Sequence, residues 1–144
     1  MHHIAIMRKS WGLIPKILSG EKTIESRWYQ TKRLPWNRVR KGDTIFFKNS
    51  GQKVSAKVRV LKVLQFKISS LGDISPILKK YANEICLVNP NPREWSKLPK
   101  YCILMKLANP KEIKPFEISK RGFSAPTAWL TVSDISKIKK YAPK

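Results

Sequence analysis

Carboxylates are scarce in this chain, whose 144 residues include 9 Asp and Glu against 30 Lys and Arg, a formal net charge of +21 at pH 7. A two-metal catalytic centre needs several carboxylates close together and therefore has little support. An excess of positive charge this large destabilises a compact chain by self-repulsion, and it is usually retained where a polyanion neutralises it. We therefore expect a nucleic-acid partner, and the plainer alternative is a lysine-rich solubilising surface.

Cysteine and histidine are also rare. Cys86 and Cys102 are the only cysteines, and they have neither CxxC spacing nor a neighbouring histidine. This pattern argues against a zinc site, and a disulfide is not expected in a reducing compartment. We expect both cysteines to be small core residues, His2 and His3 to be a surface pair, and the protein to use neither a metal nor a cofactor.

Long apolar runs are absent. No run approaches the roughly 18 residues needed to span a bilayer, and the first residues lack the basic region and apolar stretch of a signal peptide. We expect a cytoplasmic protein without a membrane partner. Apolar residues still make up 42% of the chain, enough to bury the core of one domain over residues 1–144, for which a monomer is favoured.

Apolar periodicity and turn signals divide the first half of the chain into short elements. They predict a strand at 3–7, a helix at 11–19 between Ser10 and Gly20 as caps, a strand at 23–29, a basic loop at 30–40, and a hairpin of strands 44–47 and 53–66. In the last strand, alternate residues from Val54 to Val60 are apolar, whereas Lys57 and Arg59 have the opposite parity. One face of that strand is therefore expected to be buried, and the other begins basic.

The second half gives a weaker pattern. It predicts a helix around Ser75–Tyr81, a strand at 101–107 ended by Asn109–Pro110, a short strand at 113–118, a turn at Arg121–Gly122, a strand at 129–132, and a final helix from Ser133 to Lys140. The whole pattern indicates an α+β fold with five to seven short strands and two to four short helices, arranged as a small curved sheet or barrel.

Residues 17–28, ILSGEKTIESRW, contain the pattern GxKxxExR at Gly20, Lys22, Glu25 and Arg27. This segment resembles the signature of the ASCH domain, a branch of the PUA-like superfamily, and the segments KGDTIFFKN and KPFEISKRGFSAPTAWLTVSDI resemble later strands of that family. The resemblance implies a small PUA-like mixed β-barrel that binds RNA in a basic cleft around the motif, where a modified or flipped base could be held.

The residue pattern is compatible with such a cleft. Glu25 and Arg27 are two apart on a predicted strand, so their side chains leave the same face, with Cα atoms about 7 Å apart, and the carboxylate can orient the guanidinium toward phosphate or a base edge. The candidate ligand-binding residues are Lys22, Glu25, Arg27, Trp28, Tyr29, Arg8, Lys9, Lys48 and Trp129, and the candidate phosphate-binding residues are Lys32, Arg33, Arg38, Arg40 and Lys41. The alternative is a surface ion pair beside core tryptophans.

An RNA- or nucleoside-processing enzyme remains the alternative function. Some relatives that the motif resembles are acylcytidine amidohydrolases, but Glu25 stands where their nucleophile is expected, so this activity is disfavoured. A metal-independent ribonuclease needs only a base, an acid and a cation, which Lys22, Glu25 and Arg27 could supply. RNA is favoured over DNA as the partner in either case.

The charge excess predicts that RNA binding depends strongly on salt. Neutralising about four to six phosphates of a single strand gives a slope of log K against log salt of roughly −3 to −4. Charge reversal among the candidate phosphate-binding residues should weaken binding to all sequences alike, because phosphate contacts carry no base information. Titrations of labelled RNA at several salt concentrations measure both effects, and a slope near zero would contradict the electrostatic account.

Overall fold

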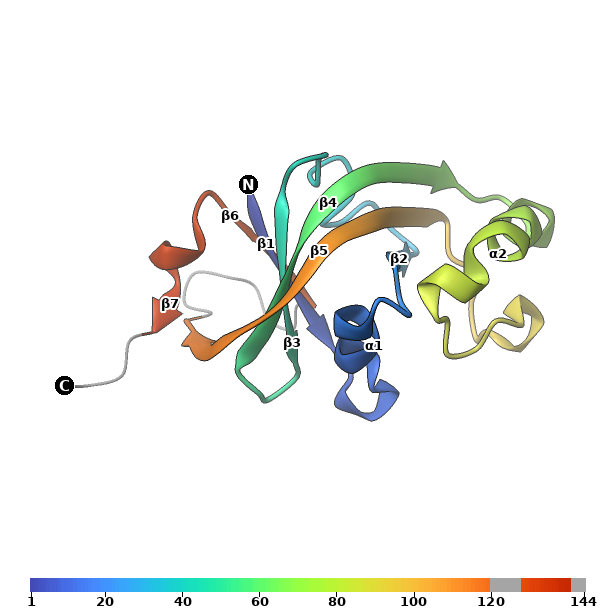
Figure 1. Ribbon diagram of the computed structural model, residues 1–144. Helices are drawn as coiled ribbons and strands as arrows, with labels where there is room; N and C mark the ends of the chain where they lie inside the picture. The colour runs from blue at the N-terminus through green and yellow to red at the C-terminus, as the bar shows by residue number, and fades with distance from the viewer. Residues whose placement is uncertain (120–127, 141–144) are drawn as a thin grey trace.

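A curved mixed sheet dominates the computed structural model, which describes residues 1–119 and 128–140. Its strands are β1 (His2–Met7), β2 (Ile24–Tyr29), β3 (Thr44–Asn49), β4 (Val54–Lys67), β5 (Tyr101–Ile118) and β6 (Trp129–Val132). They lie in the order β2-β5-β4-β3-β1-β6, and the short β7 (Lys139–Lys140) pairs with β5. Only β1 and β3 pair in parallel within these residues. Figure 1 shows β4 and β5 bending together along the molecule, so the expected α+β fold around a barrel-like sheet is confirmed.

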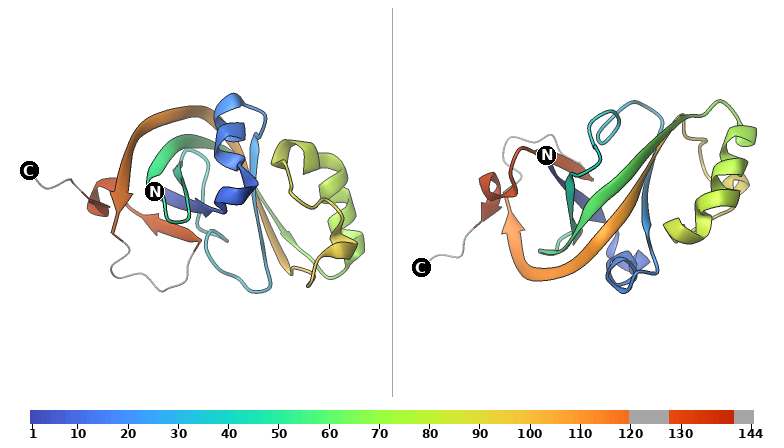
Figure 2. Two further views of the ribbon diagram at one scale, coloured as in Figure 1. Left: turned by 90° about the horizontal axis from the view of Figure 1, so that it is seen from below. Right: turned by 45° about the horizontal axis from the view of Figure 1, so that its top comes forward.

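Two α-helices pack near the β2 edge of the sheet (Figure 2). Helix α1 (Leu13–Ser19) packs into the concave core, and α2 (Leu71–Ile85) packs on the opposite face through an apolar stripe that includes Ile74, Ile77 and Leu78. The remaining helical turns are 3-10: η1 (Lys9–Trp11), η2 (Pro92–Glu94) and η3 (Ile135–Lys137). Over residues 1–119 and 128–140, no helix is long and apolar enough to cross a membrane.

The hairpin of β3 and β4 confirms the period-2 pattern of the sequence. Ala56, Val58 and Val60 are buried in the concave core, and the strands pair antiparallel. Val54 is also buried, but it lies beyond a register shift and packs in the separate cluster that contains Phe46. Beyond Val60 the register against β5 shifts, and from Val63 to Phe66 the strand is covered on both faces, by the concave core and by the cluster under α2.

The expected end of a strand at Asn109–Pro110 is wrong, because β5 continues to Ile118 and includes the separate strand expected at 113–118. Lys57 pairs with Lys111 but Arg59 pairs with Ala108, so β5 carries one extra residue between these pairs. Asn109 has φ 52°, and Pro110 lies in this bulge, where its missing N–H costs no ladder bond. The breaker pair therefore bends the strand without ending it.

Helix boundaries also differ from the sequence prediction. Ser10 lies inside η1 and does not cap α1, which begins after Gly12, whereas Gly20 ends α1 with φ 84° as expected. Helix α2 starts earlier than predicted, at a capping box of Ser70 and Asp73. The final helix expected from Ser133 to Lys140 is only the single turn η3, which Asp134 caps through Ser136 N–H before β7 begins. The predicted turn at Arg121–Gly122 lies outside the described residues.

His3 is not part of a surface pair, because its side chain is fully buried. Its Nε2 lies 2.8 Å from Asp43 Oδ2, and its Nδ1 accepts a hydrogen bond from Trp129 Nε1 at 3.2 Å. This arrangement fits a neutral ring that donates from Nε2, and burial lowers the pKa of His3 although Asp43 opposes the shift. Of the cysteines, Cys102 is a core residue as expected, whereas Cys86 is partly exposed at the end of α2.

Burial of neutral His3 predicts a stability that declines in mild acid. In the unfolded chain, His3 is protonated below its ordinary pKa of about 6.5, whereas in the folded protein it stays neutral to lower pH. The contribution of neutral His3 to the free energy of unfolding is therefore complete above pH 6.5. It is lost as the pH falls toward the pKa of the folded state. Urea unfolding from pH 7.5 to 5 should show this loss, and His3→Gln should flatten it. His2→Gln, at the half-exposed neighbour, is the control, and identical pH profiles for His3→Gln and the unchanged protein would contradict the prediction.

Candidate functional site

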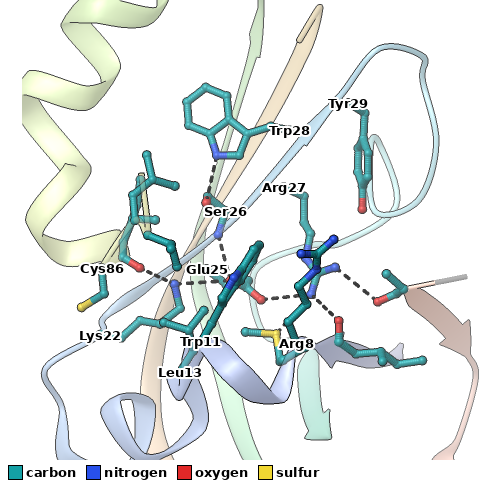
Figure 3. Close-up of a pocket in the computed structure, with 16 residues that line it drawn as sticks. Arg8, Trp11, Leu13, Lys22, Glu25, Ser26, Arg27, Trp28, Tyr29 and Cys86 are labelled. Carbon is teal, nitrogen blue, oxygen red and sulfur yellow. Dashed lines mark hydrogen bonds and ion pairs between the residues drawn. The ribbon is translucent and has the colours of Figure 1, made fainter. Parts of the chain in front are cut away.

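A pocket of about 390 Å³ lies beside β2, where four segments of the chain meet (Figure 3). Residues 25–29 form one wall, and the segment from the end of β1 through η1 contributes Met7, Arg8 and Trp11. Residues 85–88, at the end of α2 and just after it, close the other side, and Ala128 is the fourth segment. This volume falls in the usual range for small-ligand sites. The motif residues Lys22, Glu25 and Arg27 all line it.

Lys22 is almost completely buried, with 2% of its surface exposed. Its Nζ donates to Ile24 O at 2.8 Å and to Ile85 O, and it lies 3.4 Å from Glu25 Oε1. An ammonium group has three N–H donors, so these partners use all of them. Ile85 O is one of the last carbonyls of α2, which has no partner within the helix, so Lys22 ties the end of α2 to β2.

Glu25 is also buried and is surrounded by donors. Oε1 accepts from Ser26 N–H at 3.1 Å, and Oε2 accepts from Arg27 Nη2 at 3.2 Å. Burial alone would raise the pKa of Glu25, but the charges of Lys22 and Arg27 outweigh it and hold the pKa below its ordinary value. Glu25 is therefore an ionised carboxylate at neutral pH and a weak base.

Arg27 contacts Glu25, as the spacing on the strand predicts, and its other contacts lie within the protein. Nη1 donates to Ala128 O at 3.3 Å, while Nη2 also lies 3.5 Å from Ile6 O and 3.3 Å from the Met7 sulfur. The guanidinium stacks over the buried Trp129 ring, 5.2 Å from its centre. Arg27 thus ties β2 to the end of β1 and to the start of β6.

The outer edge of β2 presents main-chain groups to the pocket. Leu107 N donates to Thr23 O, so the main-chain N–H and C=O groups of odd-numbered residues in β2 point toward β5. The main-chain groups of even-numbered residues point to the other edge. There Ile24 O accepts from Lys22 Nζ, and Ser26 N–H donates to Glu25 Oε1. Trp28 has the same parity as Ser26. Among the described residues, no hydrogen bond outside the ladder reaches Ser26 O, Trp28 N–H or Trp28 O. The strand therefore offers an acceptor, a donor and a second acceptor in one row.

Aromatic rings border this row. Trp11 is 44% exposed beneath the Arg8 guanidinium, Tyr29 lies beneath Arg33, and Trp28 is fixed by a bond from its Nε1 to Ser26 Oγ at 3.0 Å. Trp129, by contrast, is a buried core residue, and the Arg27 guanidinium lies over its ring.

The other candidate residues are not brought into the pocket. Lys48 lies on β3 beside a different hollow, and Lys9 is exposed on η1 outside the pocket lining. The five basic residues of the loop between β2 and β3 are all exposed: Lys32, Arg33, Arg38, Arg40 and Lys41. Within residues 1–119 and 128–140, and leaving Lys48 and Lys139 aside, only two Lys or Arg side chains pair with a carboxylate. They are Lys22 and Arg27.

Sequence reasoning missed Trp11, Ser26 and the segment 85–88 as parts of the pocket. The one signal that the sequence offered was a tryptophan, Trp11, three residues after Arg8. Residues 85–88 carry no motif and reach the pocket only through the packing of α2. Among the described residues, no three His, Cys, Asp or Glu side chains come close enough to hold a metal ion.

Three solved structures share this fold. The ASCH protein of Zymomonas mobilis aligns with a TM-score of 0.66 at 16% identity, covering 91% of this chain and 87% of that one. Two single-residue variants of the Zymomonas mobilis protein align with a TM-score of 0.68 at 15% and 16% identity, each over 94% of this chain and over 93% and 91% of theirs. The similarity confirms the ASCH-type fold that the motif predicts. No protein-family model and no curated protein matches the sequence.

The buried cluster predicts that Lys22 is needed for stability. Lys22→Met leaves the Glu25 carboxylate with one cation fewer and two carbonyls without a donor, and breaking a buried pair in this way costs about 3–5 kcal/mol. Urea unfolding should show this loss. Lys79→Met, at an exposed position on α2, is the control, and an unchanged free energy of unfolding in Lys22→Met would show that the fold does not depend on this ammonium group.

Proposed function

We propose that this protein binds RNA and holds one unstacked base in the pocket beside β2. The observation that carries the proposal is the unpaired row of main-chain groups on β2, because it faces a pocket bordered by aromatic rings. A base needs in-plane donors and acceptors for its edge and a flat surface for its face. The edge of β2 supplies the first, and Trp11 and Trp28 supply the second.

The surrounding charge supports a polyanionic ligand. Arg8 and Arg33 lie over Trp11 and Tyr29 beside the pocket, and neither guanidinium pairs with a carboxylate in the described part of the chain. The basic loop extends this surface away from the pocket. RNA fits better than duplex DNA, because single-stranded loops and ends of RNA present unstacked bases to proteins.

The motif residues support a binding function over catalysis. The donors of Lys22 are used within the protein, and the lowered pKa of Glu25 makes it a poor general base. We assign Lys22, Glu25 and Arg27 the task of fixing β2, so that its outer edge and Trp28 keep one geometry before the ligand binds. A site held in this way loses less entropy on binding.

Loss of a stacking ring predicts weaker RNA binding without loss of the fold. Stacking of one base is worth about 1–3 kcal/mol, so Trp11→Ala should raise Kd roughly 5- to 150-fold. Fluorescence anisotropy with a labelled single-stranded RNA measures the change, and circular dichroism melting checks the fold. Leu61→Ala is the control, since Leu61 is 48% exposed and lies outside the pocket. An unchanged Kd in Trp11→Ala would contradict the proposed site.

A second assay separates binding from cleavage. Purified protein is incubated with the same RNA, with and without EDTA, and the products are resolved on native and denaturing gels. Intact RNA with a mobility shift agrees with a binding protein. Cleavage that survives EDTA and disappears in Glu25→Gln would instead support a metal-independent ribonuclease.

A further inference from the structure

A stripe of cations follows the convex face of the long β4–β5 hairpin, opposite the concave core. Val58 and Val60 of β4, and Met105 and Leu107 of β5, belong to or pack against the concave core, so Lys57, Arg59 and Lys106, which have the other parity, point away from it. Register shifts on either side of Arg59 and Val60 bring Lys62 and Lys111 to the same outward face, opposite Lys106 and Lys57. These outward residues include Lys57, Arg59, Lys62, Lys106 and Lys111, which we call the outer stripe. Figure 1 shows the two strands running side by side between α2 and β7.

Like charges face each other within this stripe. Lys57 is the cross-strand partner of Lys111, and Lys62 is the partner of Lys106. Directly opposed residues have Cβ atoms about 4.5–5.5 Å apart, and like charges at this distance destabilise a sheet. None of the five side chains pairs with a carboxylate within residues 1–119 and 128–140; Lys106 has only the Tyr81 ring, 5.9 Å away. The stripe therefore holds two repulsive pairs that the described structure does not neutralise.

The ends of the same face are used for packing, whereas its middle is not. Phe46, Ile113 and Phe116 pack in a cluster at the end near β7, and α2 packs on the face at the other end. Between them Arg59, Lys62 and Lys111 are exposed. The five residue-to-residue steps from Lys57 to Lys62 span about 16 Å at the usual rise of a strand, long enough to follow several phosphates of an extended nucleic-acid strand.

We propose that the outer stripe is a second nucleic-acid contact, which binds the phosphodiester backbone independently of the base pocket. The pocket opens at the edge of β2 beside its concave-facing residues Glu25 and Arg27, whereas the stripe lies on the convex face. Lysine ammonium groups are flexible point charges that suit phosphate and carry no base preference. The outer stripe shares with the proposed function only the premise that the bound polyanion is a nucleic acid.

The test neutralises one facing pair and measures binding and stability together. In Lys57→Gln combined with Lys111→Gln, loss of two phosphate contacts should reduce the magnitude of the log–log salt slope for a labelled single-stranded RNA by about 1.4. The thermal midpoint should stay the same or rise, because a repulsive pair is removed. Lys79→Gln combined with Lys97→Gln removes the same charge from exposed positions outside the stripe and should keep the slope of the unchanged protein.

The outcomes separate this proposal from the pocket. An unchanged slope in the stripe variant, or an equal decrease in the control, overturns the stripe whatever happens at Trp11. A reduced slope in the stripe variant together with unchanged binding by Trp11→Ala keeps the stripe and overturns the pocket. If the unchanged protein binds anionic lipid vesicles but neither RNA nor DNA, both proposals are overturned.

Discussion

The buried cluster of Lys22, Glu25 and Arg27 fixes β2 in place. Removing three charges from water is costly, and such a cluster is tolerated only when nearly every donor and acceptor finds a partner. Here the partners include the main chain of other elements, namely Ile85 O at the end of α2 and Ile6 O and Ala128 O beside Arg27. Satisfying the charges therefore holds α2, β1 and the start of β6 at fixed positions around β2, and those elements form the walls of the pocket.

This arrangement changes what the motif can do. A lysine, a glutamate and an arginine in one cleft have the composition of a catalytic site, yet their hydrogen-bonding capacity is spent largely on each other and on the main chain. The groups left to meet a ligand are the edge of β2 and the rings of Trp11 and Trp28. In the proposed function, the charged residues hold these groups in one geometry and do not transfer protons.

The basic residues outside the buried cluster lie in two kinds of structure, a loop and a pair of strands. The loop between β2 and β3 carries exposed basic residues on an irregular segment, whereas the outer stripe carries them on two paired strands of the sheet. A charge on a loop can move away from its neighbours, but Lys57 and Lys111 are held opposite each other by the sheet register. Their repulsion is built into the fold, and a bound polyanion would relieve it.

Local pattern alone determined the elements whose residues interact with near neighbours. The alternation from Ala56 to Val60 determined the buried face of β4, Gly20 determined the end of α1, and the two-residue spacing determined that Glu25 meets Arg27. Sequence could not decide whether Asn109–Pro110 ends a strand or forms a bulge, because that depends on the register of β4. Nor could it place His3 in the core, since Asp43 and Trp129 come from distant parts of the chain. The free or occupied state of each donor in the site was likewise decided by tertiary structure, because Ile85 O and Ala128 O reach β2 only after the chain has folded.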